Sequence, residues 1–159
     1  MRKKQTGFSL IELLIVVAII LIIAAIAIPN LLRSKMAANE ASAVGSLRTL
    51  NTASVEYSTS YGGYPSNLTV LGPIASGGTA SSGLADLVDS VLSSGIKSGY
   101  TFALTVGTSD ANGNVLSYHT TATPTSPGTT GQRYFYSDQS GVIRANSAGA
   151  ATATSTPLS

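Results

Sequence analysis

The feature that constrains this chain most is an apolar run at residues 8–28, in which Glu12 is the only ionisable side chain. As a helix, a run of this length extends about 30 Å, which matches the hydrocarbon core of a bilayer. Arg2, Lys3 and Lys4 stand directly before the run, with no acidic residue among them. Because positive flanks stay in the cytoplasm, we predict one membrane-spanning helix with the rest of the chain outside.

Glu12 is costly in this setting, since placing a carboxylate in hydrocarbon costs about 2.5 to 3.5 kcal/mol on insertion scales. A cationic partner would offset that cost. The alternative is a plain signal anchor, in which Glu12 is an accidental polar residue near the interface and Pro29 merely ends the span. No small-residue cleavage site follows the run, so we expect the apolar segment to be retained.

The residues around the run resemble the class III leader of type IV pilins and type II secretion pseudopilins. The resemblance rests on the segment Lys3 to Gly7, followed by Phe8 to Glu12. It implies that residues 1–7 form a leader, which a dedicated peptidase removes between Gly7 and Phe8 before it methylates Phe8. The new α-amine of Phe8 is then four residues from Glu12, which assigns Glu12 to subunit assembly.

The resemblance continues at Pro29, where pilins typically carry a proline that loosens the helix during filament assembly. Proline removes a backbone donor and clashes with the preceding turn, so we predict a helix break, as a kink or local melting, at Ile26 to Pro29. Residues 8–29 therefore form the predicted transmembrane and assembly helix.

Residues 30–61 predict a second, amphipathic half of the same helix. At 100° per residue, one side carries an apolar stripe, in which Glu40 is an exception without an assigned role. Gly62 and Pro65 predict the end of the helix after Tyr61. The members of the stripe are Met36, Ala43, Val44, Leu47, Leu50, Tyr57 and Tyr61.

Residues 62–146 predict a small globular head. Apolar spacing predicts a short helix over 84–92 with Ser82 as its N-cap. Alternation predicts strands at 100–106 and 115–122, then a hairpin of 133–137 and 142–145. Three or four antiparallel strands laid on the helix give an α+β fold, the pilin architecture. The final segment, residues 147–159, is expected to be mobile.

Composition excludes several classes of function. Three of the nine basic residues lie in the leader, so the mature chain has six against seven acidic residues and a side-chain charge of −1. We therefore predict no nucleic-acid groove. Cysteine is absent, which excludes disulfides and thiolate chemistry. Many pilins close their C-terminal region with a disulfide, so this head must be held by sheet pairing, packing or neighbouring subunits.

The sequence offers little for catalysis. His119 is the only histidine and has no accompanying nucleophile motif or metal-ligand spacing. Asp110 and Asn112 are weak candidates for a metal site, but the calcium-loop alternation and its closing Glu are missing, so a turn explains them better. We expect neither enzymatic activity nor a cofactor.

Our leading interpretation is a pilin, a structural subunit of a type IV pilus. It is inserted in the inner membrane with a cytoplasmic N-terminus, processed by the prepilin peptidase and methylase, and polymerised by the inner-membrane assembly machinery into an extracellular helical filament of identical subunits. One alternative is a major pseudopilin of a type II secretion system, which acts in the periplasm. The other is a monomeric, membrane-anchored extracytoplasmic binding domain.

Overall fold

The computed structural model describes residues 7–158 and contains one long helix and a six-stranded sheet. Helix α1 spans Leu10–Tyr61. The chain divides into two compact units, Met1–Lys35 and Met36–Ser159, so the head includes the second half of α1. The predicted leader residues 1–6 lie outside the described residues.

Helix α1 continues through Pro29, so the predicted local melting at this residue is absent from this structure, whereas the predicted kink stays a prediction. Proline leaves the carbonyl of Ala25 without its usual helical donor and strains the preceding turn. The rest of the hydrogen-bond ladder and the helix-forming neighbours keep the segment helical.

The C-terminal half of α1 buries the predicted apolar stripe against the head. Ala43, Leu47, Leu50 and Tyr57 are buried. Gly62 has a φ of 80°, and its N–H donates to the carbonyl of Ser58 at 3.0 Å. This left-handed glycine ends the helix where the sequence predicts.

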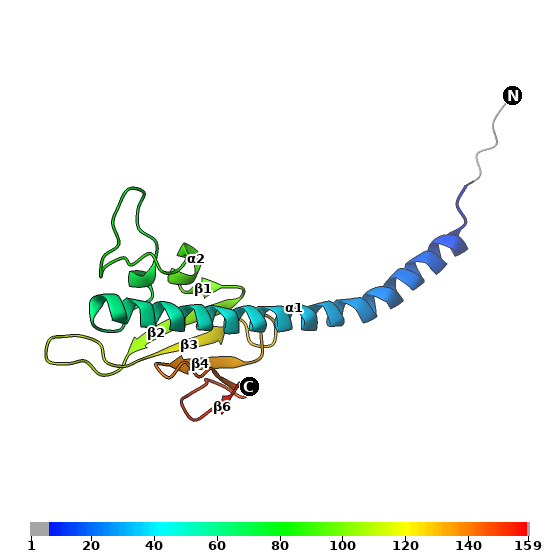
Figure 1. Cartoon of the computed structure of the whole chain (residues 1–159). Helices are drawn as coiled ribbons and strands as arrows, with labels where there is room; N and C mark the ends of the chain where they lie inside the picture. The colour runs from blue at the N-terminus through cyan, green and yellow to red at the C-terminus, as the bar shows by residue number, and fades with distance from the viewer. Residues whose placement is uncertain (1–6, 159) are drawn as a thin grey trace. The chain divides into compact units, whose positions relative to one another are not determined.

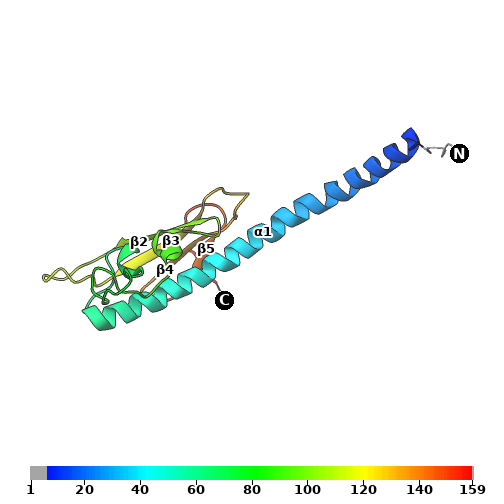
Figure 2. The same cartoon turned by 90° about the horizontal axis from the view of Figure 1, so that it is seen from above.

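The sheet is entirely antiparallel and follows the chain in the order β1-β2-β3-β4-β5-β6. Figures 1 and 2 show the second half of α1 lying along one face of it. The strands are β1 (Ile96–Lys97), β2 (Tyr100–Val106), β3 (Tyr118–Pro124), β4 (Tyr134–Asp138), β5 (Arg144–Asn146) and β6 (Thr156–Pro157).

Alternation along the central strands supplies the sheet side of the core. Phe102 on β2 pairs with Ala122 on β3, which pairs with Phe135 on β4, and all three are buried. Tyr100 is also fully buried, and its ring lies 5.8 Å from that of Phe135. The α+β architecture predicted from sequence is confirmed.

The predicted helix over 84–92 is largely wrong. Only α2, Ser90–Ser93, is helical, and its N-cap is Asp89, whose Oδ1 accepts from the N–H of Leu92 at 2.8 Å. Upstream, Asp86 has a φ of 57°, which a helix does not allow. The N–H groups of residues 85–88 bond instead to carbonyls in and beside the 3₁₀ helix η1, Thr69–Leu71.

The second predicted strand begins later than expected. Residues 115–117 precede β3, and Leu116 is exposed rather than facing the core. The N–H groups of Leu116 and Ser117 both bond to the carbonyl of Thr108. This arrangement closes the β2–β3 connection before the regular ladder starts.

The C-terminal segment, which its composition predicts to be mobile, pairs with the edge of the sheet in this structure. Strand β6 pairs with β5, and the N–H of Leu158 donates to the carbonyl of Ile143 at 2.8 Å. Ala151 is buried, and Leu158 packs against the core. Backbone pairing at a sheet edge needs no bulky side chains, which explains why composition misses it.

Candidate functional site

Glu12 lies in the first turn of α1, where it forms a capping box with Ser9. Its Oε2 accepts from the backbone N–H of Ser9 at 2.9 Å, and Ser9 Oγ accepts from the N–H of Ile11 at 3.4 Å. These bonds satisfy amide groups that the start of a helix otherwise leaves unpaired. The first helical turn is therefore fixed by the same carboxylate that the sequence assigns to assembly.

The capping role of Glu12 was missed in the sequence. Ser9 followed three residues later by Glu12, before an apolar run, is the pattern of a capping box. A carboxylate offers about four acceptor positions, so the cap leaves capacity for a further donor. Glu12 can therefore receive a cation without giving up its bond to Ser9.

Gly7 and Phe8 precede α1 and are both exposed, with Phe8 at 74%. A Cβ on Gly7 would meet no heavy atom within 4 Å, so nothing in the described part of the chain covers this bond. The peptide bond between the two residues is accessible to an enzyme. The other residues of the predicted leader, including Arg2, Lys3 and Lys4, lie outside the described residues.

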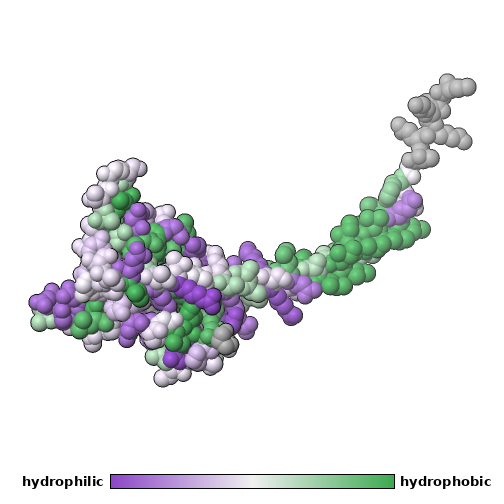
Figure 3. All heavy atoms as spheres, viewed as in Figure 1, coloured by the Kyte–Doolittle hydropathy of each residue, from purple (hydrophilic) through white to green (hydrophobic). Residues whose placement is uncertain are grey.

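The first unit presents an apolar surface on every side of the helix. Its 18-residue apolar window is long enough to cross a membrane, and none of it is buried. Figure 3 shows one face of this helix, on which apolar side chains predominate. An exposed surface of this extent requires lipid or protein around it. The exposed large apolar side chains of this unit are Phe8, Leu10, Ile11, Leu13, Leu14, Ile15, Val16, Val17, Ile19, Ile20, Leu21, Ile22, Ile23, Ile26, Ile28, Leu31 and Leu32.

Glu40, which the sequence leaves without a role, joins α1 to the chain before β4. It is buried, and its Oε1 accepts from the N–H groups of Gln132 at 2.8 Å and Arg133 at 3.1 Å. Its Oε2 accepts from Nε of Arg133 at 2.7 Å. Burial alone would raise the pKa of Glu40, but these donors outweigh it and hold the pKa below its usual value.

Two neighbouring contacts strengthen this attachment. Asn39 Nδ2 donates to the carbonyl of Thr130 at 2.8 Å, and the Tyr100 hydroxyl donates to the carbonyl of Arg133 at 2.8 Å. Burial also raises the pKa of Tyr100 well above its usual range. In a chain without cysteine, these polar contacts attach the segment before β4 to α1.

Asp110 and Asn112 form a turn. Asp110 Oδ1 accepts from the N–H groups of Asn112 and Asn114, both at 2.8 Å, and Oδ2 accepts from Asn114 Nδ2 at 2.9 Å. These bonds, led by that of the Asn114 side chain, lower the pKa of Asp110. A bound cation would have to displace these donors.

His119 lies on the outer face of the sheet and stacks on Tyr136, with ring centroids 5.4 Å apart. Within residues 7–158, no three acidic, histidine or cysteine side chains gather into a possible metal site. His119 is accordingly part of a surface aromatic pair.

Comparison with known proteins agrees with this arrangement. Residues 2–28 match the prokaryotic N-terminal methylation motif. Over 38 residues the chain is 58% identical to the type IV wide pilus major component PilA4 of Thermus thermophilus, covering 24% of this chain and 29% of that protein. Over 63 residues it is 40% identical to the type II secretion system core protein G of Vibrio cholerae, covering 40% of this chain and 43% of that protein.

An exposed apolar helix with a methylation motif, followed by an antiparallel α+β head, fits the membrane-anchored precursor of a pilus or pseudopilus subunit. The motif, the two relatives and the architecture all match the family of type IV pilins and type II secretion pseudopilins over the segments compared. The matched segments span less than half of either relative.

Proposed function

We propose that this chain is a structural subunit of a type IV pilus, cleaved after Gly7, methylated on Phe8 and polymerised through the N-terminal part of α1. The observation that carries the proposal is the exposed apolar run of residues 8–28, in which Glu12 is the single acid. In a filament, the helices of neighbouring subunits replace lipid around residues 8–28. The role is structural and requires no catalytic group or cofactor.

The charge of Glu12 sets the position at which one subunit docks against the next. Cleavage gives Phe8 a positive α-amine, and Glu12 of a neighbouring subunit supplies its counter-ion while still capping its own helix. A wrongly placed neighbour would leave two charges unpaired in an apolar interior, at a cost of several kcal/mol. Correctly placed subunits are therefore favoured, because a misplaced subunit has the free-energy cost of unpaired charges.

Two substitutions separate the charge of Glu12 from its capping role. Glu12→Gln keeps an acceptor for the N–H of Ser9 but removes the charge, whereas Glu12→Ala removes both. We expect both variants to be processed and membrane-bound but to yield at least about tenfold fewer filaments, since one unpaired buried charge costs more than 1.4 kcal/mol. Electron microscopy of sheared filaments, with peptide mass identification, measures the yield.

Ser9→Ala is the matched control, because it weakens the cap and leaves the charge in place. It should assemble nearly as the wild type does. Normal filament yield from Glu12→Gln would contradict the charge-pairing mechanism. A processed wild-type chain that remains a monomer would contradict the filament function and support a membrane-anchored binding domain.

The second candidate is a pseudopilin of type II secretion. It is favoured by the longer match to the type II secretion core protein, 63 residues against 38 for the pilus component. The same microscopy separates the two functions. Long surface fibres containing this chain support the pilus, and a chain confined to the periplasm supports the pseudopilus.

A further inference from the structure

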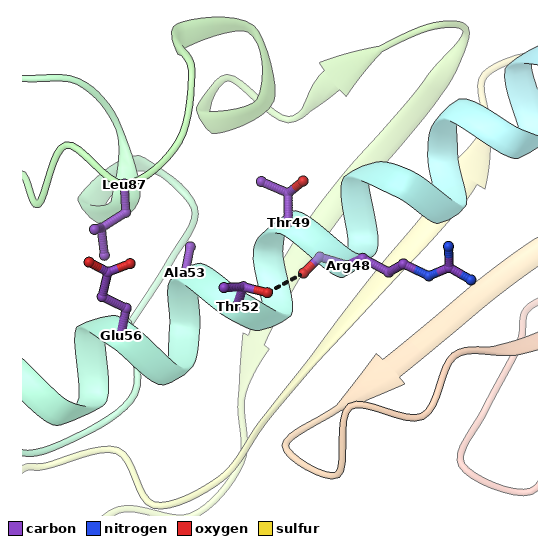
Figure 4. Close-up of a pocket in the computed structure, with 6 residues that line it drawn as sticks. All are labelled: Arg48, Thr49, Thr52, Ala53, Glu56 and Leu87. Atoms are coloured by element: carbon purple, nitrogen blue, oxygen red, sulfur yellow. Dashed lines mark hydrogen bonds between the residues drawn. The ribbon is translucent and has the colours of Figure 1, made fainter.

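The exposed side of α1 in the head carries a shallow groove with a charge at each end. Its lining residues are Arg48, Thr49, Thr52, Ala53, Glu56 and Leu87, and its volume is about 320 Å³. Figure 4 shows Glu56 beneath Leu87 at one end, while the guanidinium of Arg48 points away from it at the other. The two charges therefore do not meet within one chain.

Neither charge has an ion-pair partner in the described part of the chain. Among residues 7–158, the ion pairs are Lys97 with Asp89 and Arg133 with Glu40. Arg48 and Glu56 are both exposed. Opposite charges at fixed positions on one element provide complementarity for a second copy of the same element.

Gly45, one turn before Arg48, has no explanation inside the chain. A glycine within a helix costs about 0.5 to 1 kcal/mol relative to alanine. A Cβ at Gly45 would meet no heavy atom within 4 Å, so no contact in the described residues requires its absence. Close approach by another molecule would require it. Gly45 and the groove lie on the same exposed side of α1.

We propose that this side of α1 binds a second copy of the chain, parallel and staggered, with Glu56 of one copy paired to Arg48 of the next. The inference rests on the proposed filament function. Eight residues separate the two side chains, which corresponds to a stagger of about 12 Å along the helix. They also lie about 80° apart around the helix axis, so each faces a different neighbour.

This contact can repeat from copy to copy, because a pair of copies joined by it still has a free Arg48 at one end and a free Glu56 at the other. Each copy uses Arg48 toward one neighbour and Glu56 toward the other, which is a heterologous contact that builds an open array. An antiparallel arrangement would instead satisfy both charges in one closed pair and stop growth. The parallel stagger is the arrangement that a filament subunit requires.

Charge reversal tests the pairing in the full-length chain. Arg48→Glu and Glu56→Arg should each lower the yield of sheared filaments at least about tenfold, because each places like charges together. The double variant restores opposite charges and should recover the yield to within about threefold of the wild type. Thr123→Glu, which adds a charge at an exposed position of β3 outside the groove, is the control and should leave the yield unchanged.

Gly45 provides a second test that does not depend on charge. Gly45→Leu should reduce filament yield by a similar factor, while thermal unfolding of the detergent-extracted chain stays at or above the wild-type temperature. Gly45→Ala is the matched small substitution and should reduce the yield much less. These measurements separate a loss of assembly from a loss of folding.

The proposed staggered contact would be contradicted by normal filaments from either single charge reversal or from Gly45→Leu. It would also be contradicted if the double variant did not recover the yield. A wild-type dimer in detergent that either reversal dissociates would indicate antiparallel closure and also overturn it. These failures leave the effect of Glu12→Gln intact, whereas failure of the filament function itself removes filaments from the wild type.

Discussion

Two acidic side chains stand where the sequence pattern calls for apolar residues, and the molecule accommodates them differently. Glu12 is held at the exposed start of a helix by the N–H of Ser9, which leaves acceptor capacity for a partner from another subunit. Glu40 is buried and receives donors from Gln132 and Arg133. The first is suited to assembly, and the second stabilises the head.

Glu40→Gln should destabilise the head by about 2 kcal/mol, because an amide cannot replace a carboxylate that accepts from two backbone N–H groups and a guanidinium. Since the folded-state pKa of Glu40 lies below the ordinary 4.5, its contribution is present above that pH and is lost as pH falls through the folded value. Urea unfolding between pH 7 and pH 3 measures both effects.

The difference between wild type and variant should be largest near pH 7 and shrink toward pH 3. Arg48→Gln is the control for this measurement, since Arg48 is exposed and has no ion-pair partner within residues 7–158. A constant difference across the whole pH range would show that Glu40 acts through packing rather than through its charge.

At the scale of elements, prediction succeeded where a pattern is local and repeated. The end of α1 follows from Gly62, and β2 and β4 follow from alternation over several residues. Prediction from the sequence failed where backbone N–H groups bond to another segment of the chain rather than within a helix. Residues 85–88 match helical spacing, yet their N–H groups bond to residues 70–72, a pairing that the spacing does not encode.

The two edge strands show a second limit. Strands β1 and β6 contain two residues each, too few for a period to be recognised. The capping box of Ser9 and Glu12 was readable, because its spacing is a local signal, whereas the partners of Glu40 lie 92 and 93 residues away. Hydrogen bonds between residues close in the sequence can therefore be predicted from it, whereas partners about 90 residues apart cannot.

The C-terminal strand is expected to stabilise the head in place of a disulfide. Ending the chain at Ser155 removes β6 and the contact of Leu158 with the core. We expect a loss of about 2 kcal/mol, from a partly buried leucine and the edge hydrogen bonds. Leu158→Ala, which keeps the strand, should lose about half as much. Unchanged urea midpoints in both variants would contradict this role.

At the scale of the whole molecule, the two units expose different kinds of surface. Residues 7–35 expose apolar side chains, whereas the unit Met36–Ser159 has its own buried core and carries most of the charged residues. Such a division suits a subunit that is anchored by one part and presents the other to water.

The head alone should therefore fold. A fragment of residues 36–159 is expected to be soluble without detergent, to run as a monomer in gel filtration and to unfold in one cooperative step. The full-length chain, as its control, should require detergent. A fragment that aggregates or lacks a cooperative transition would show that the head depends on the first unit for its stability.

The most direct test of the account is the intact mass of the subunit in sheared filaments. The account predicts a chain that begins at Phe8 and is heavier by one methyl group, with Gly7→Val accumulating in the membrane as the uncleaved precursor. Filaments built from a chain that still begins at Met1, or a cleaved chain found only as monomers, would contradict it.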